Sequence, residues 1–358
     1  MKINLKNFNL KLKEEIPVDE FLDKALYQPN IGYYENKIPF GREGDFITAP
    51  TISNLFSEII GIWFITAWES FGKPKKFNIV ELGPGDGSLA KTVIKTFKKF
   101  PEFNKATSLF LYEKSELLKK VQKKNINDNK IRWIKDLNFI KNGPTIFFGN
   151  EFFDAIPIKQ FIKNSKNFLE KCYVVDNQGL HEKYRPATSL DEAGIKSFKA
   201  LEKLKFVEYP KLGFRELDGI AKKINSLSGG VLLIDYGYLN HTNENTIQLI
   251  RKNKKINMNY LLENLGKVDI TSLVNFKLLK EYFTKNNLRV KKIVSQKFFL
   301  EKMGILERAK ILEKNMNEKQ KGYMKQTLFR LLHQNLMGEL FKVIFAFKAK
   351  NENFLGFK

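Results

Sequence analysis

Three glycines that alternate with other residues mark the segment whose composition points most directly to chemistry. The glycines are Gly83, Gly85 and Gly87. They lie between an apolar stretch, 78–82, and an amphipathic stretch, 88–97, where glycine lets a backbone turn tightly and approach a ligand. The pattern is not the dinucleotide fingerprint, because that motif needs a further glycine where this chain has Ser88. The segment therefore predicts a ligand site of another kind.

The charges around the glycines favour a cationic ligand. Glu81 and Asp86 lie beside and within the loop, where two carboxylates would repel a pyrophosphate. S-adenosyl-L-methionine carries a sulfonium and an ammonium group, has no phosphate, and its carboxylate can rest on a helix N-terminus. We therefore expect this cofactor, held by the loop that also contains Pro84. The alternative is a glycine turn that serves packing alone.

Two later acids have positions that suit the same ligand. Glu113 ends the second apolar run, where a carboxylate can accept hydrogen bonds from both ribose hydroxyls. Asp136 follows the third run and could accept from the adenine amino group. Taken singly, each is as readily a surface acid or a helix cap. Their order along the chain favours cofactor binding.

A further acidic segment, Asn150-Glu-Phe-Phe-Asp154, follows the fourth apolar run. Buried charges without partners are costly, so Glu151 and Asp154 should face a cation or hydrogen-bond donors. A guanidinium satisfies two carboxylates through charge-assisted hydrogen bonds. We predict that the catalytic residues are Asn150, Glu151 and Asp154. Capping of the next helix is the alternative role for Asp154.

These acids follow short apolar runs that alternate with amphipathic helices, which is typical of a parallel sheet with helices on both faces. The predicted strands are 78–82, 109–112, 131–134, 145–149, 231–235, 290–296 and 342–347. Carboxyl ends of parallel strands meet at one edge, where open α/β sheets bind ligands. The sequence thus predicts an α/β fold that brings the acids to the glycine loop.

Residues 170–228 interrupt the alternation and predict an insertion between the fourth and fifth strands. Segments 172–175 and 181–184 flank Asn177-Gln-Gly179 as the strands of a hairpin would. The chain then divides into four regions: an N-terminal helical lid region, 1–72; a first half of the core, 73–169; the insertion, 170–228; and a second half of the core, 229–358.

The N-terminal region has the pattern of helix, loop and helix. Between helices near 18–26 and 52–71 lies the polar segment 41–50, which has two glycines and little reason to exist for packing alone. We expect this segment to close over the ligand. The lid residues predicted from it are Asp45, Thr48 and Pro50.

Composition limits the class of protein. At 358 residues and 43% hydrophobic, the chain is globular and long enough to bury a core. The net charge of +23 suggests an anionic partner, but only eight of the 62 basic residues are arginine. Because base and phosphate recognition favours the arginine fork, we expect no stable nucleic-acid complex.

A single cysteine, Cys172, excludes an internal disulfide framework and a cysteine-based zinc site. It favours reducing surroundings, and the sequence lacks the pattern of an export signal, so we expect a cytoplasmic protein. The most apolar stretch, 59–68, is about half as long as a bilayer span requires. We expect neither a transmembrane helix nor a metal; the oligomeric state stays open.

Taken together, the motifs resemble those of the class I methyltransferases, and more closely the MidA-like group, which is related to a mitochondrial complex I assembly factor. The segments that carry the resemblance are 32–34, 44–50 with Ser53 and Phe56, 80–85, 150–157, 234–237 and 337–338. The resemblance implies a seven-stranded Rossmann-like sheet, S-adenosyl-L-methionine as cofactor, and arginine N-methylation of a protein, a subunit of respiratory complex I. It also implies that Tyr34 faces the substrate.

Three positions depart from the group's pattern. The group usually has a histidine and an aspartate where this chain has Leu273 and Asn275. Relatives commonly carry arginine at the position of Asp86. If the histidine were a required base, activity would be reduced, so a catalytically silent assembly scaffold stays open as a second function. A nucleic-acid N-methyltransferase and an enzyme that methylates small molecules stay open as well.

Overall fold

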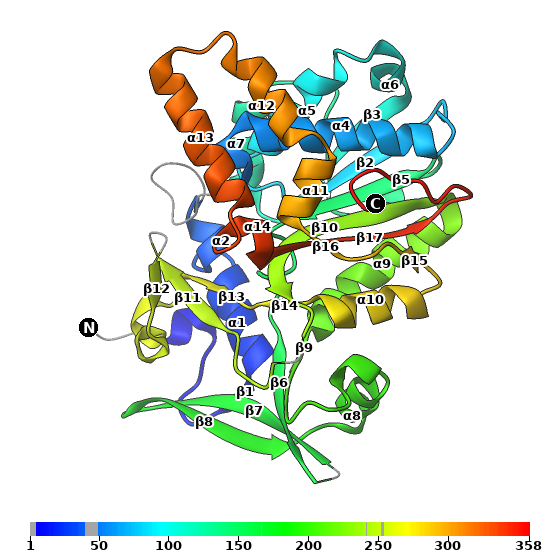
Figure 1. The fold of residues 1–358 in the computed structure, drawn as a ribbon. Helices are drawn as coiled ribbons and strands as arrows, with labels where there is room; N and C mark the ends of the chain where they lie inside the picture. Colours follow the sequence, from blue (N-terminus) through cyan, green and yellow to red (C-terminus); the bar gives the residue numbers. More distant parts are fainter. Residues whose placement is uncertain (1–4, 40–48, 166, 241, 252–253) are drawn as a thin grey trace. The chain divides into compact units, whose positions relative to one another are not determined.

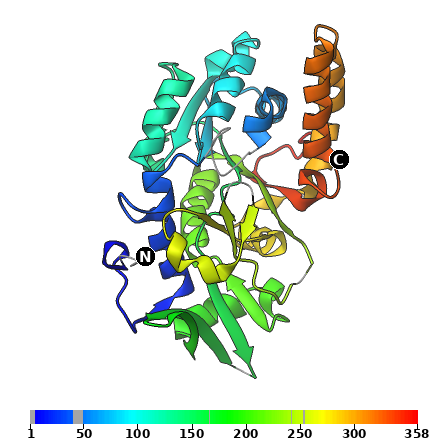
Figure 2. The same ribbon diagram turned by 90° about the vertical axis from the view of Figure 1, so that its left-hand side faces the viewer.

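The structure is a computed structural model that describes residues 5–39, 49–165, 167–240, 242–251 and 254–358. The chain forms two compact units, drawn as ribbons in Figures 1 and 2. Unit 1 comprises residues 1–46, 153–218 and 238–282, and unit 2 comprises 47–152, 219–237 and 283–358. Each unit thus combines stretches that are distant in sequence, whereas the four regions expected from the sequence were consecutive.

The centre of unit 2 is a twisted sheet. Its strands are β2 (Phe77–Leu82), β3 (Thr107–Tyr112), β4 (Arg132–Ile134), β5 (Thr145–Asn150), β10 (Gly229–Tyr238), β15 (Arg289–Val290), β16 (Val294–Ser295) and β17 (Phe341–Lys348). Their order is β15-β17-β10-β5-β2-β3-β4, and β16 also pairs with β17. The strands from β10 to β4 run parallel, and β17 is antiparallel to β10. Figure 1 shows this sheet with its helices.

Six predicted strands are confirmed within a few residues, but the prediction of one continuous strand over 290–296 is wrong. That segment forms only the two-residue strands β15 and β16, and Gln296 begins helix α11. Its middle stays attached to β17, since the Lys291 N–H donates to the Phe345 carbonyl at 2.9 Å. Side chains of a regular strand alternate between faces, so the adjacent lysines 291 and 292 would place one charge on each face. The irregular backbone avoids this.

Helices flank the sheet of unit 2. They are α3 (Ala49–Ile52), α4 (Asn54–Ser70), α5 (Ser88–Phe97), α6 (Pro101–Ala106), α7 (Glu116–Ile126), α11 (Gln296–Lys302), α12 (Ile305–Glu313), α13 (Glu318–Leu332) and α14 (Met337–Leu340), with a short 3-10 turn at Leu137–Phe139. Helix α4 packs on the strands through edge-to-face aromatic pairs. The ring centroids of Trp63 and Phe345 are 5.1 Å apart, and those of Phe64 and Phe148 are 5.6 Å apart. The predicted helices at 52–71 and 88–97 are confirmed.

Unit 1 has two sheets. The first has the order β1-β7-β6-β9, with β8 paired to β7, and the second has the order β12-β11-β13. The strands are β1 (Glu15–Pro17), β6 (Lys159–Asn164), β7 (Asn167–Asp176), β8 (Gly179–Pro186), β9 (Phe206–Tyr209), β11 (Gln248–Arg251), β12 (Lys254–Ile256) and β13 (Asp269–Thr271). The two-residue strand β14 (Val274–Asn275) also falls within the bounds of unit 1 but belongs to neither of these sheets. The predicted hairpin is confirmed as β7 and β8, closed where Asp176 opposes Gly179.

The helices of unit 1 are α1 (Val18–Tyr27), α2 (Tyr33–Asn36) and α8 (Ser189–Lys196), with 3-10 turns at Leu5–Phe8, Lys199–Leu201, Met258–Tyr260 and Leu262–Asn264. Helices α9 (Lys211–Leu227) and α10 (Phe276–Lys285) run from unit 1 into unit 2. The first sheet extends beyond the expected insertion, because β6 begins before residue 170 and β1 pairs with β7, Ile16 opposite Tyr173. Helix α1 contributes Val18 and Phe21 to the core of this unit.

The register of unit 2 brings three loops to one edge of the sheet. Leu82, at the end of β2, lies opposite Tyr112 of β3 and Gly149 of β5. The next residues on these three strands are Gly83, Glu113 and Asn150. Strands β3 and β5 flank β2 on opposite sides, so this edge is a topological switch point, where open α/β sheets bind ligands.

Candidate active site

The glycine loop between β2 and α5 depends on left-handed backbone. Gly83, Gly85 and Gly87 have φ values of +59°, +56° and +82°. Residues with a Cβ pay about 1–2 kcal/mol in this region. A side chain would also be crowded at two of the positions: a Cβ on Gly87 would lie 2.9 Å from Ile126 Cδ1, and one on Gly83 would lie 3.1 Å from the Phe152 ring. Glycine therefore fits both the backbone conformation of the loop and its packing.

Glu81 lies on β2 immediately before this loop. Its side chain is 6% exposed, and its Oε2 atom is buried without a hydrogen-bond partner in the described part of the chain. Burial, and secondarily the negative charge of Asp86, raises the pKa of the Glu81 carboxyl well above its usual range. A buried carboxyl with an unused acceptor is a binding group for a cationic ligand.

Glu113 is joined to the glycine loop by a residue that the sequence reasoning missed. Gln122 on α7 is completely buried, and its side-chain amide donates to Glu113 Oε2 at 3.0 Å and to the Gly85 carbonyl at 2.9 Å. Its side-chain oxygen accepts from Trp133 Nε1 at 2.9 Å. Gln122 thereby ties three neighbouring segments together. The available signal was a polar residue at a buried helical position, between Leu118 and Ile126.

Glu113 also accepts from the Ser115 N–H at 2.8 Å, and burial raises the pKa of its carboxyl despite these hydrogen bonds. Asp136, predicted from the same rule, has a different environment. It is exposed and accepts from the Asn138 N–H at 2.8 Å, so it caps the short 3-10 turn that follows β4. Of these two predicted acids, the structure thus buries Glu113 in a network with the loop and leaves Asp136 at the surface.

Asp86 accounts for the start of α5. Its carboxylate accepts from the Ser88 N–H at 2.9 Å and from the Ser88 hydroxyl at 2.8 Å. Asn125 on α7 donates to the Asp86 carbonyl at 2.9 Å. Asp86 therefore stabilises the turn into the helix.

The end of β5 places Asn150 and Glu151 at the same edge. Glu151 has a left-handed backbone, with φ of +50°, which is uncommon for a residue with a side chain. Its N–H donates to the Ile234 carbonyl at 2.9 Å, and its Oε1 accepts from the Asn150 amide at 3.1 Å. The turn that follows puts Phe152 against Gly83. Two predicted catalytic residues therefore stand beside the glycine loop in unit 2.

The third predicted catalytic residue, Asp154, belongs to unit 1 and is 6% exposed. Its carbonyl accepts from the Ser272 N–H at 3.1 Å. In the same unit, the Tyr34 hydroxyl donates to the buried carboxylate of Asp269 at 2.9 Å. The Tyr34 ring stacks on the Tyr27 ring, with the two ring centroids 5.4 Å apart. Burial raises the pKa of Tyr34 well above its usual range, and Asp269 and Asp154 add to the shift.

Pro50, in the predicted lid, lies in the short helix α3 of unit 2. The other two predicted lid residues, Asp45 and Thr48, lie outside the described residues.

Comparison with known proteins identifies the family of the chain. A family model described as an S-adenosyl-L-methionine-dependent methyltransferase matches residues 59–294. The mitochondrial protein arginine methyltransferase NDUFAF7 homolog of Drosophila melanogaster is 31% identical over 316 residues, which cover 80% of this chain and 71% of that protein. The chain belongs to this methyltransferase family. The human mitochondrial protein arginine methyltransferase NDUFAF7 is 28% identical over 363 residues. The matched residues make up 93% of this chain and 80% of the human protein.

A solved structure shares the fold of this methyltransferase. A COG1565 superfamily member from Burkholderia thailandensis, bound to S-adenosyl-homocysteine, superimposes with a TM-score of 0.79 at 21% identity, covering 96% of this chain and 90% of its own. The expected α/β class I methyltransferase fold is therefore confirmed.

The residues of this methyltransferase fit its cofactor. The three left-handed glycines expose backbone without side chains just after β2, which suits a ligand lying against the chain. The unpartnered Glu81 oxygen offers an acceptor to a cation, and S-adenosyl-L-methionine is a cation. A phosphate-bearing dinucleotide would meet two carboxylates, Glu81 and Asp86, at the same place.

One expectation about this methyltransferase is wrong. The low cysteine content was taken to favour the cytoplasm, but the named relatives, among them those from Drosophila melanogaster, Mus musculus and Homo sapiens, are mitochondrial proteins. Cysteine usage reports on the redox state of a compartment, and more than one compartment is reducing. Across the described helices, none is long and apolar enough to cross a membrane.

Proposed function

We propose that this methyltransferase transfers a methyl group from S-adenosyl-L-methionine to an arginine side chain of a protein. The proposal for the acceptor is supported by the names of the relatives, which are protein arginine methyltransferases. The observation that carries the site is the convergence of the glycine loop, a buried acid network and Asn150-Glu151 at the carboxyl edge of three neighbouring strands.

The cofactor roles follow from the chemistry of each group. We assign contact with the cofactor to the loop residues Gly83, Pro84, Gly85 and Gly87. Glu81 would accept from the ammonium group, Glu113 from the ribose hydroxyls, and Asp136 from the adenine amino group. Gln122 holds the Glu113 carboxylate and the loop carbonyl of Gly85 in fixed positions. The bound cofactor supplies an electrophilic methyl group on a sulfonium.

The acceptor side follows from two carboxylates and an amide. In this proposal Glu151 accepts hydrogen bonds from the guanidinium and leaves electron density on the attacking nitrogen. Asp154 supports the same group from a second side, and Asn150 orients Glu151 through its amide. Tyr34, Asp45, Thr48 and Pro50 are assigned to substrate contact and to exclusion of water from the site.

The decisive variant is Glu151→Gln, which keeps the shape of the side chain and removes its charge. We expect binding of S-adenosyl-L-methionine, measured by calorimetry, to stay within about threefold of wild type. Turnover of a protein acceptor, measured with a labelled methyl donor, should fall by roughly 100-fold or more, the scale of a positioned acid or base. Glu102→Gln, an exposed acid on α6, is the matched control. Equal loss of binding and turnover, or loss of neither, would defeat the proposed role.

The acceptor protein that we propose is a subunit of respiratory complex I, which rests on the resemblance to the MidA-like group. Purified complex I subunits and the labelled donor test this directly, with amino-acid analysis of the labelled product. Label in methylarginine supports the proposal. Label only in nucleic acid would replace it with nucleic-acid N-methylation, and no label in any acceptor, despite cofactor binding, would favour the scaffold.

A further inference from the structure

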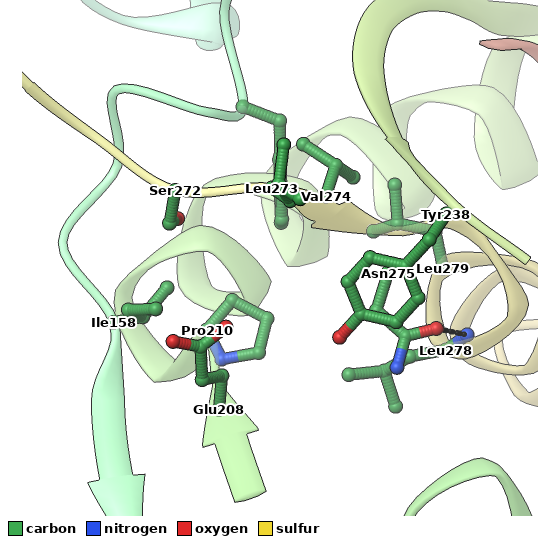
Figure 3. Close-up of a pocket in the computed structure, with 11 residues that line it drawn as sticks. Ile158, Glu208, Pro210, Tyr238, Ser272, Leu273, Val274, Asn275, Leu278 and Leu279 are labelled. Atoms are coloured by element: carbon green, nitrogen blue, oxygen red, sulfur yellow. Dashed lines mark hydrogen bonds between the residues drawn. The ribbon is translucent and has the colours of Figure 1, made fainter. Parts of the chain in front are cut away.

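The pocket around Glu208, which Figure 3 shows in unit 1, is too small for a side chain or a larger ligand. Its cavity volume is about 20 Å³, which holds about one water molecule. Both carboxylate oxygens of Glu208 already accept hydrogen bonds, from the Gln160 amide at 2.9 Å and from the N–H and hydroxyl of Thr246 at 2.9 and 2.5 Å. The side chains around this pocket therefore hold the wall of unit 1 together.

The surface of unit 1 has a long open sheet edge at β8 (Figure 1). Strand β8 pairs with β7 over all eight of its residues, 179–186, and among the described residues no strand pairs with its other side. Residues 181–184 are all exposed. Strand β9, at the opposite edge of the sheet, has four residues, and β4, at an edge of the sheet of unit 2, has three. Strand β8 is therefore the longest open edge in the described sheets.

The hydrogen bonds of β7 show which main-chain groups of β8 point outward. In an antiparallel pair, hydrogen-bonded residues alternate with residues whose N–H and C=O groups point away from the partner strand. At the end of the pair, the Ala187 N–H donates to the Phe168 carbonyl at 2.9 Å. On the opposite side of β7, the Lys13 N–H donates to the Val175 carbonyl at 2.8 Å. Odd-numbered residues of β8 therefore bond to β7, and the N–H and C=O groups of residues 180, 182 and 184 face outward.

Two charged side chains of β8 are compensated by their neighbours on β7. Arg185 Nε donates to the buried carboxylate of Glu170 at 2.9 Å. On the other face of the hairpin, Glu182 Oε1 lies 2.5 Å from Nζ of Lys171, whose side chain is only 3% exposed. These two pairs stabilise the hairpin, so their charges are not free to select a partner.

Lys183, in contrast, keeps much of its charge in the solvent beside the edge. Its side chain is 58% exposed, and its ion-pair partner, Glu15, is 3.4 Å away and 40% exposed. Such a surface pair contributes little, about 0–1 kcal/mol. On the opposite face of the strand, Leu180 and Tyr184 present apolar surface. The edge thus combines open main-chain groups with one positive charge and two apolar side chains.

A second copy of the chain is an unfavourable occupant of this edge. The two registers that overlap two antiparallel β8 strands most fully place Glu182 opposite Glu182 or Lys183 opposite Lys183. Like charges directly opposite each other destabilise a strand pair. Charged residues on an open edge thereby oppose pairing between copies of the same chain. The occupant should therefore be a strand of different sequence.

We propose that β8 binds an extended segment of a partner protein, which adds to the sheet as an antiparallel strand. Main-chain hydrogen bonds supply the affinity in this mode of binding, and alternate side chains supply the specificity. An acidic side chain of the segment lies opposite Lys183, and apolar side chains lie opposite Leu180 and Tyr184. The inference goes beyond the proposed methyl transfer, because none of the residues assigned to that reaction lies in β8.

Hydrogen exchange of single amides, followed by NMR on the full chain, tests the proposal. The probe is the peptide acetyl-Thr-Val-Glu-Thr-Glu-Val-Thr-amide, and its control has lysine in place of both glutamates. In the free protein, the amides of residues 181, 183 and 185 should exchange slowly and those of 180, 182 and 184 rapidly. With the glutamate peptide at about ten times its dissociation constant, exchange at 180, 182 and 184 should slow about tenfold. The lysine peptide should bind roughly tenfold more weakly, because it places like charges opposite Lys183.

A pair of variants at Tyr184 isolates the main-chain contribution. Tyr184→Pro removes one outward N–H and leaves the hydrogen bonds to β7 in place, since proline is tolerated in an edge strand where the N–H faces solvent. Tyr184→Val is the matched control, because it loses the same ring and keeps the N–H. The proline variant should bind the glutamate peptide roughly tenfold more weakly than the valine variant. Thermal unfolding checks that both variants fold, and the exchange pattern of wild type decides the matter if the proline variant does not.

The proposal is overturned if about 1 mM glutamate peptide adds no protection at residues 180, 182 and 184, if the two peptides bind equally, or if the two folded variants do. Protection of the same amides without peptide, increasing with protein concentration, would assign the edge to a second copy and also overturn it. The probe contains no arginine and no methyl donor is present, so the result is independent of whether the protein methylates arginine.

Discussion

At the scale of single residues, the site depends on acids that are kept away from water. Glu81 and Glu113 both have a raised pKa because burial disfavours their charged forms. Glu113 has hydrogen bonds that partly compensate for burial, whereas one Glu81 oxygen has no hydrogen-bond partner among the described residues. The energetic cost of a buried charge at Glu81 is reduced when the carboxyl takes up a proton or when a cation binds beside it. Such residues are typical of binding sites rather than of folding nuclei.

The raised pKa of Glu81 predicts the pH dependence of cofactor binding. A cationic ligand prefers the ionised carboxylate, so binding releases a proton, and affinity for S-adenosyl-L-methionine should rise with pH above the ordinary value of 4.5, until pH passes the raised pKa. Calorimetry in buffers of different ionisation enthalpy, between about pH 5 and 7, measures the released protons. The Glu81→Gln variant should release fewer protons when the cofactor binds. Unchanged proton release in that variant would show that Glu81 stays neutral in the complex.

The raised pKa of Glu81 also determines whether the stability of the fold rises or falls with pH. The folded chain holds the Glu81 proton more tightly than the unfolded chain, so without ligand stability falls as pH rises from 4.5 towards the raised pKa. Above that window, Glu81→Gln should unfold at a higher temperature than wild type while binding the cofactor more weakly. Such an exchange of stability for function is common at binding sites.

At the scale of elements, the junction of β2 and α5 combines two separate requirements. The loop needs left-handed backbone at three positions, and Ile126 of helix α7 comes close enough to crowd a Cβ at Gly87. Helix α7 in turn carries Gln122, which bonds to both the loop and Glu113. The position of α7 therefore sets the geometry of the loop.

These two requirements can be separated with a matched pair of variants. Gly87 and Gly72 share a φ of +82°, but a Cβ on Gly72 would meet nothing within 4 Å. Both Gly87→Ala and Gly72→Ala should lose about 1–2 kcal/mol of unfolding free energy in urea from the backbone alone. Only Gly87→Ala should also lose affinity for S-adenosyl-L-methionine, because Ile126 and α7 must move. Equal affinities in the two variants would contradict the role of this contact.

At the scale of the whole molecule, the chain divides its chemistry between two units. The glycine loop, Glu81, Glu113 and Glu151 belong to unit 2, whereas Tyr34 and Asp154 belong to unit 1. The residues that we assign to the cofactor are thus in unit 2. A bound cofactor should therefore stabilise unit 2 more than unit 1.

Hydrogen exchange tests this division. S-adenosyl-homocysteine at about 100 times its dissociation constant should stabilise the fold by about 2.7 kcal/mol. Added protection should concentrate in segments 83–97 and 112–126 of unit 2, while β7 and β8 of unit 1 change little. Equal protection of both units would show that they open as a single cooperative structure, and would remove the expected separation of ligand effects.

Features that depend on neighbouring residues could be predicted from the sequence. Alternating glycines indicated a tight turn, apolar periodicity indicated helices α1, α4 and α5, and Asn177-Gln-Gly179 indicated the β7–β8 hairpin. Each depends on local steric or hydrophobic patterns, which a sequence displays directly. The order of acids after successive strands predicted the edge where they meet, because parallel strands place their carboxyl ends together.

The burial of those acids could not be predicted from the sequence, because it depends on residues that are distant in the chain. Glu113 and Asp136 satisfied the same sequence rule, yet Gln122 draws one into a buried network and nothing covers the other in the described structure. The pairing of β1 with β7 and the pocket around Glu208 likewise depend on contacts across long sequence separations. Such contacts follow from how the elements pack, and no local pattern records them.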